Sequence, residues 1–169
     1  MKSNFRLKNL IYTKSNILRG ALIYSAGDAI AAVLLNEFSI YRLAGMMLIG
    51  ATIYAFEVPN YFAWIEKKTI AYSGLKKTLA KTGLAIGYFN PLWIWRHLLF
   101  IKIFSGNLAA INIDLFRIAC ISFLVNIPIS FIANYSIQNK IKLSWRFLAS
   151  AIFSALMAIY YALSETIFN

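Results

Sequence analysis

Apolar residues in this chain are gathered into long blocks that are separated by short polar and basic segments. Five blocks approach the length of a membrane-spanning helix: residues 20–36, 43–65, 82–105, 115–137 and 147–164. A helix rises about 1.5 Å per residue, so about 20 apolar residues cross a hydrocarbon core of about 30 Å. The blocks lack the alternation of barrel strands, and an isolated strand would leave backbone groups unpaired in lipid. The pattern predicts an all-α integral membrane bundle of five spans, or of four if the last block lies on the membrane surface.

The basic residues between the blocks are unequally divided between the two sides of such a bundle. One set of segments holds most of them, namely Lys2, Arg6, Lys8, Lys14, Arg19, Lys67, Lys68, Lys76, Lys77, Lys81, Lys140 and Lys142. The other set has only Arg42. Cytoplasm-side loops carry the excess of Lys and Arg, so this division predicts that the N-terminus lies inside. Residues 1–19 are expected to form a basic interfacial segment before a single transmembrane domain over 20–169, with an organelle-targeting presequence as the alternative.

Composition supports the membrane assignment and excludes other classes. The chain of 169 residues is 60% hydrophobic and 14% charged, and its mean hydropathy is +0.65. Soluble domains average about 45–50% apolar and about 25% charged residues. The net charge of +11 does not indicate a nucleic-acid partner, because the basic residues lie between apolar blocks. A single cysteine, Cys120, and a single histidine, His97, make a disulfide or a metal site hard to build. No cofactor or catalytic motif is recognised, so we expect a protein that is not an enzyme.

Asp28, Glu57, Arg96 and His97 lie well inside the predicted spans, whereas Lys102 is close enough to the end of its span to reach the membrane surface. Such groups cost about 2.5–3.5 kcal/mol each on insertion scales, so they are rare in membrane helices. Pairing Arg96 with either Asp28 or Glu57 would neutralise the charges. The functional interpretation is that all four residues line or gate a path for a small solute. The alternative is a buried ion pair that only orients helices, and His97 alone is more typical of a hydrogen-bonded interior histidine.

Other residues in the blocks indicate helix packing. Small residues around Gly27 should let a second helix approach the first span closely, which would place that span centrally or support a homo-oligomer. Prolines inside spans are expected to kink them, and Asn134 should hydrogen-bond between helices. Trp64 lies at a span end like an interfacial aromatic residue, and Arg146 lies at the edge of the last span. The prolines are Pro59, Pro91 and Pro128.

These spacings resemble the Mpv-seventeen/PMP-twenty-two family of small peroxisomal and mitochondrial inner-membrane proteins. The matching positions run through nearly the whole chain: Gly27-Asp28, Arg42, Met46, Gly50, Pro59, Trp64, Lys77, Pro91, Gly106, Pro128, Asn134 and Arg146. The chain differs from the family pattern at Ala32, Phe62, Ala85 and Phe131, where the family has polar residues. A weaker resemblance, to the bacterial L-alanine exporter family, rests on Arg42-Leu43, Ser73-Gly74 and Pro91.

The first resemblance implies a compact helical bundle that acts as a weakly selective channel for small solutes or metabolites. The second implies a small amino-acid exporter, and a structural membrane protein without transport is the third hypothesis. The expected partners are the lipid bilayer and a small-molecule solute. Pattern alone does not distinguish a bacterial inner membrane from a mitochondrial inner or peroxisomal membrane.

Overall fold

The computed structural model describes residues 10–167, with side chains up to residue 160. Over this range the chain is all-helical and contains no strand, which confirms the predicted class. The helices are α1 (Lys14–Leu34), α2 (Ile40–Ile49), α3 (Ala55–Lys68), α4 (Gly74–Tyr88), α5 (Pro91–Phe104), α6 (Ile113–Lys140) and α7 (Leu143–Ile167). A π-helical segment, η2 (Gly50–Tyr54), joins α2 to α3, and a 3-10 turn, Leu108–Ala110, precedes α6.

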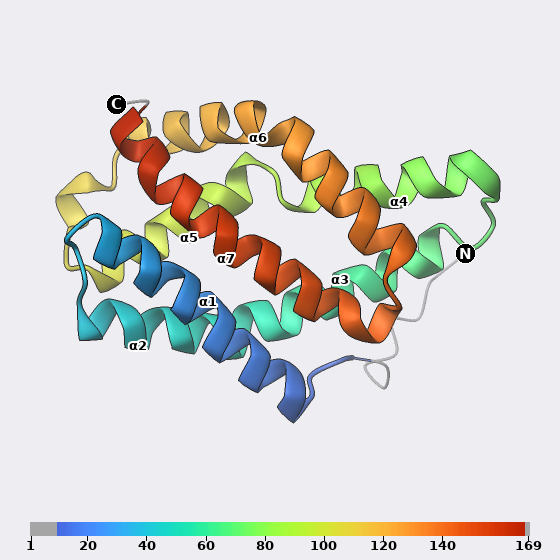
Figure 1. Ribbon diagram of the computed structural model, residues 1–169, viewed down its shortest axis with the longest axis horizontal. Coiled ribbons are helices and arrows are strands. Elements are labelled where there is room, and N and C mark those ends of the chain that lie inside the picture. The colour runs from blue at the N-terminus through green and yellow to red at the C-terminus, as the bar shows by residue number, and fades with distance from the viewer. Residues whose placement is uncertain (1–9, 168–169) are drawn as a thin grey trace, which may run out of the picture.

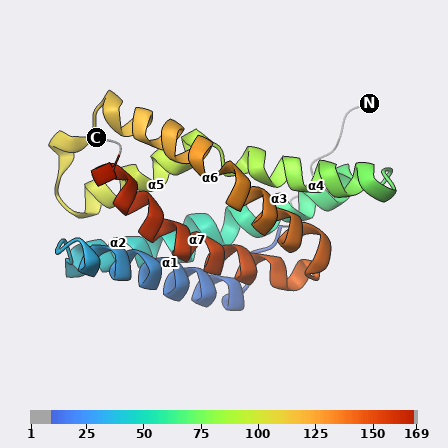
Figure 2. The same ribbon diagram turned by 45° about the horizontal axis from the view of Figure 1, so that its top comes forward.

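The chain runs back and forth along the long axis of the molecule (Figure 1). Helices α1 and α7 run in the same direction, and α4 followed by α5 runs that way too. The continuous stretch from α2 to α3 and the long helix α6 run the opposite way. Figure 2, turned by 45°, shows α7 between α1 on one side and α6 on the other, and α7 contacts both.

Three of the described helices are long and apolar enough to cross a membrane: α1, α6 and the Leu143–Tyr160 part of α7. They correspond to the first, fourth and fifth predicted blocks. Helix α1 already begins at Lys14, so the end of the expected interfacial segment belongs to this helix, whereas residues 1–9 lie outside the described range. Large apolar side chains are exposed along these helices, among them Leu22, Ile30, Val33, Leu124, Ile129 and Ile132. A helical bundle in a lipid bilayer needs apolar side chains on its surface and keeps charged side chains in its interior.

The prediction that residues 82–105 form one continuous helix is wrong, because two helices meet there. Helix α4 ends at Tyr88, and α5 begins at Pro91. The Asn90 side chain caps α5 by accepting a hydrogen bond from the Trp93 backbone N–H at 3.1 Å. Asparagine at the cap followed by proline at the first helical position is a strong helix start. Pro91 therefore begins a helix rather than kinking one, whereas Pro59 and Pro128 lie inside α3 and α6.

The face of small residues on α1 packs against its neighbours at backbone distance. A Cβ atom placed on Gly20 would lie 2.2 Å from the carbonyl oxygen of Gly50 in η2. One placed on Gly27 would lie 2.6 Å from Ala155 of α7. Helix α1 also contacts α2 and α3. The expectation that other helices approach α1 closely is confirmed, but α1 lies at one side of the bundle, and α7 lies between it and α6 (Figure 2).

Candidate functional site

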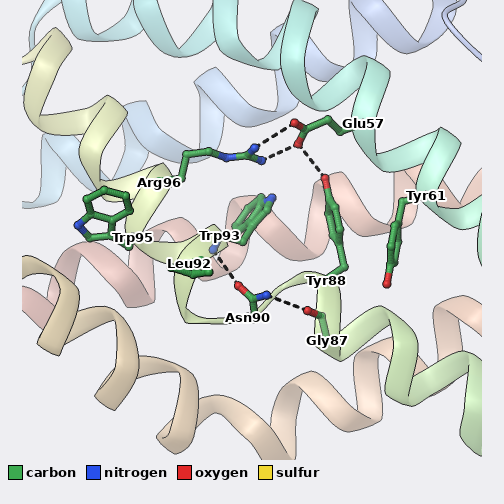
Figure 3. A pocket seen from close by; sticks show the side chains of 9 residues that line it. All are labelled: Glu57, Tyr61, Gly87, Tyr88, Asn90, Leu92, Trp93, Trp95 and Arg96. Carbon is green, nitrogen blue, oxygen red and sulfur yellow. Dashed lines mark hydrogen bonds and ion pairs between the residues drawn. The ribbon is translucent and has the colours of Figure 1, made fainter.

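Glu57 of α3 and Arg96 of α5 form a paired carboxylate and guanidinium. Nη1 of Arg96 donates to Oε1 of Glu57 at 2.9 Å, and Nη2 donates to Oε2 at 2.6 Å. The Tyr88 hydroxyl, at the end of α4, donates to the same Oε2 at 3.0 Å (Figure 3). One of the two pairs predicted for Arg96 is therefore present. Its two parallel hydrogen bonds are the strong arrangement of an arginine with a carboxylate.

This pair lies on the wall of a cavity of about 520 Å³. The side chains of Arg96 and Glu57 are 31% and 33% exposed, so the charges are held in place without being sealed off. Aromatic rings form much of the remaining wall: Tyr61, Tyr88, Trp93 and Trp95 (Figure 3). The Tyr61 and Tyr88 rings stack with their centroids 4.4 Å apart. The cavity therefore combines one fixed charge of each sign with flat apolar surfaces.

The break between α4 and α5 positions these groups. The amide of Asn90 donates to the Gly87 carbonyl at 3.0 Å while its oxygen caps α5. The end of one helix is thereby tied to the start of the next (Figure 3). Tyr88 then lies at the last residue of α4 and Arg96 in the second turn of α5, and both reach Glu57 across the opening. An uninterrupted helix would not present its residues around an opening in this way.

Asp28 does not lie on this cavity, and its partner is Arg42 rather than Arg96. Nε and Nη2 of Arg42 donate to the two Asp28 carboxylate oxygens at 2.9 and 2.8 Å. Nη1 donates to Glu37 at 3.1 Å. The side chains of Arg42 and Asp28 are only 2% and 1% exposed. The expectation that Arg42 lies in a polar loop is wrong, because it lies in the first turn of α2 and is buried.

His97 is buried one layer behind the cavity wall. Its Nδ1 lies 3.0 Å from the Tyr54 hydroxyl, and its ring stacks on Trp93 with centroids 5.6 Å apart and planes only 4° apart. Trp93 lines the cavity, and His97 does not. Of the four ionisable residues predicted to line a common path, the structure brings together only Glu57 and Arg96.

A further ion network, which the sequence interpretation missed, joins α3, α4 and α7 at the basic end. The Glu66 carboxylate accepts from Lys81 at 2.6 Å and from Arg146. Arg146 also donates to the Ile141 carbonyl at 2.9 Å and to Gln138 at 3.3 Å. Burial alone would raise the pKa of Glu66, but the hydrogen bonds and charges of Lys81 and Arg146 lower it below its ordinary value. This network fastens the start of α7 to the rest of the bundle.

The remaining predicted structural residues occupy ordinary positions. Trp64 is 39% exposed, and the Lys68 ammonium lies 5.6 Å from its ring centroid, as expected near a membrane surface. The Asn134 amide is buried and donates to the Ser130 carbonyl of its own helix at 2.9 Å. This hydrogen bond of Asn134 therefore lies within α6 rather than between helices.

No family model matches the chain, and no similar protein was found among curated proteins or solved structures. The family resemblances therefore stay expectations, and function must be argued from the site itself.

Proposed function

We propose that this protein is a multi-pass membrane protein that lets small polar solutes cross the bilayer as a weakly selective channel, with the Glu57–Arg96 cavity as the place of solute contact. The observation that carries this proposal is a pair of opposite charges, each side chain about one-third exposed, on the wall of a cavity of about 520 Å³. Ionisable groups at membrane depth are retained mainly where they serve a pathway or pair with each other. Here they do both.

The proposed topology has five passes with the N-terminus inside. Helices α1, α6 and α7 supply three passes, and the apolar part 43–65 of the unbroken helical stretch 40–68 supplies another. Helices α4 and α5 together supply a broken pass in the same direction as α1 and α7 (Figure 1). The basic ends of α3 and α6 and the starts of α4 and α7 lie toward one end of the molecule, whereas α1 runs in the same direction as α4 and α7 but begins nearer the middle (Figure 1). The positive-inside rule places that end in the inner compartment.

The chemistry of the cavity explains weak selectivity. A lining with a single sign of charge attracts one sign of ion, whereas a carboxylate beside a guanidinium favours neither. Nε of Arg96 is buried and has no hydrogen-bond partner among the described residues. A small polar solute that enters beside the pair can exchange hydrogen bonds with Arg96 and Glu57, while the aromatic walls contact its apolar part.

The same observation favours a second candidate, an exporter of a small amino acid. A zwitterion carries one carboxylate and one ammonium, which match Arg96 and Glu57 in charge. A carrier and a channel differ in kinetics, because flux through a carrier saturates with solute concentration and flux through a channel does not saturate over the same range.

The test is solute flux into liposomes that contain the purified full-length protein. We expect Glu57→Gln and Arg96→Gln each to change the flux of small amino acids and organic acids at least severalfold. Glu37→Gln and Arg117→Gln are matched controls, because they make the same chemical changes at exposed positions outside the cavity, and they should leave flux unchanged. Absence of flux with the folded wild-type protein would contradict both transport functions and leave the structural role.

A further inference from the structure

A second cavity lies between the first turns of α1 and α7, two helices that run in the same direction (Figure 1). Its volume is about 650 Å³, and residues from the first turns of both helices line it together with Pro59 of α3. Neither helix has an acidic residue in its first turn, and none of the residues lining the cavity is acidic. Two positive helix ends therefore meet beside one cavity without a neutralising carboxylate.

Asn16 points to a ligand in this cavity. It is only 8% exposed and lines the cavity. Its backbone N–H is capped by Thr13 at 3.2 Å, but its side-chain amide makes no hydrogen bond to a residue in the described part of the chain. An amide can both donate and accept hydrogen bonds, so the Asn16 side chain can bind a polar group that enters the cavity.

Arg19 supplies the charge. Its guanidinium lies 5.0 Å from the ring centroid of Trp145, in a cation–π contact. It forms no ion pair with an acid in the described range. Arg19 and Trp145 both line the cavity. An arginine that is held by an aromatic ring and lacks a carboxylate partner is well suited to bind a phosphate.

The rest of the wall is apolar and is contributed by Ile11, Pro59, Leu143 and Phe147. Because α1 and α7 are both long enough to cross a membrane, their first turns lie at a membrane surface. A ligand that is anionic at one end and apolar at the other fits both the wall and this position.

We propose that this cavity binds the headgroup phosphate of an anionic phospholipid from the leaflet at the basic end. Arg19 and the Asn16 amide contact the phosphate oxygens, and the apolar wall contacts the glycerol and the first methylene groups. Free phosphate has the same anionic chemistry, but it would leave the apolar wall unused. This inference does not depend on the proposed transport function.

The test is native mass spectrometry of the detergent-solubilised full-length protein titrated with phosphatidylglycerol or phosphatidylcholine. We expect one phosphatidylglycerol to bind more tightly than phosphatidylcholine, and Arg19→Gln to weaken that binding about tenfold through loss of charged hydrogen bonds. Asn16→Asp should weaken it at least as much, because a carboxylate would repel the phosphate. An acid in the first turn of a helix is favourable, so this variant should keep its fold. Circular dichroism checks the helix content of both variants.

Lys67→Gln is the matched control, because it removes one exposed charge from the same end of the bundle and does not line the cavity. It should bind phosphatidylglycerol like the wild type. If Lys67→Gln and Arg19→Gln weakened phosphatidylglycerol binding equally, the lipid would be attracted by the overall charge, and the proposed site would be overturned. The site would also be overturned if the folded Asn16→Asp variant bound phosphatidylglycerol as tightly as the wild type. Equal binding of the two lipids, or full displacement of the lipid by inorganic phosphate at equal concentration, would overturn the assignment to an anionic phospholipid.

Discussion

Replacing Asp28 with leucine would leave the Arg42 guanidinium buried without its main counter-ion. The two hydrogen bonds between these side chains measure 2.9 and 2.8 Å, and both side chains are almost fully buried. The third bond of Arg42 goes to Glu37, whose side chain is 54% exposed, so water screens it. Asp28→Leu therefore removes the two hydrogen bonds that lie inside the bundle.

The expected cost follows from these contacts. A hydrogen bond to a charged group contributes about 1.5–3 kcal/mol, and removing one member of a buried ion pair costs about 3–5 kcal/mol. We expect Asp28→Leu and Arg42→Met each to lower the free energy of unfolding by about 3–5 kcal/mol. The double variant should lie within about 2 kcal/mol of the wild type, because no buried charge is left alone. The coupling energy between the two positions should then exceed about 3 kcal/mol.

The assay is a double-mutant cycle on reversible unfolding in mixed micelles, followed by circular dichroism. Glu37→Gln is the control, and its expected cost is below about 1 kcal/mol because that ion pair is exposed. Single variants that cost less than about 1 kcal/mol would refute the reasoning. So would a double variant whose cost equals the sum of the two single costs, because the two side chains would then not interact.

Three further predictions concern other parts of the fold. Gly50→Ala should lower the free energy of unfolding by about 1–3 kcal/mol, because the new Cβ would lie 2.3 Å from a backbone oxygen of α1. Gly83→Ala should instead raise the melting temperature, because a Cβ at that position meets nothing within 4 Å. Asn90→Ala should cost about 1 kcal/mol through loss of the α5 cap. The pKa of Glu66 is lower in the folded protein than its ordinary value, so the ionised carboxylate stabilises the fold. This stabilisation is fully present above the ordinary pKa and is lost as the pH falls through the lower, folded-state pKa. The stability difference between wild type and Glu66→Gln, measured by thermal unfolding, should therefore shrink from neutral pH to about pH 3.

The helices with continuous apolar sequence were predictable, because hydrophobicity and membrane length are local properties. Helices α1, α6 and α7 each coincide with a predicted block. The error at 82–105 also has a local cause. The average hydrophobicity of this block hides the helix break at Asn90-Pro91, although a cap residue followed by proline is a recognisable helix start. The π-helical segment at Gly50–Tyr54 has no comparable local signal, and its Gly50 is in close backbone contact with Gly20, which lies 30 residues earlier in the chain.

The pairing of charges was only partly predictable, because it depends on which helices meet. Glu57–Arg96 was one of two pairs considered, whereas the true partner of Asp28 lies only 14 residues along the chain. Arg42 was assigned to a loop because it lies between the predicted blocks 20–36 and 43–65, but α2 begins at Ile40 and Arg42 is buried in its first turn. The Tyr88 hydroxyl had no sequence signal, since its contact with Glu57 requires the break after α4.

Thiol block of flux through the Glu57–Arg96 cavity tests the central claim most directly. Gly87 lines the cavity, and a Cβ there meets nothing within 4 Å, so Gly87→Cys in a Cys120→Ser background should fold normally. Gly83→Cys in the same helix is equally free of contacts and does not line the cavity. We predict that a charged methanethiosulfonate reagent reduces solute flux in liposomes for Gly87→Cys and not for Gly83→Cys. Unchanged flux through fully labelled Gly87→Cys protein would contradict a solute path at this cavity.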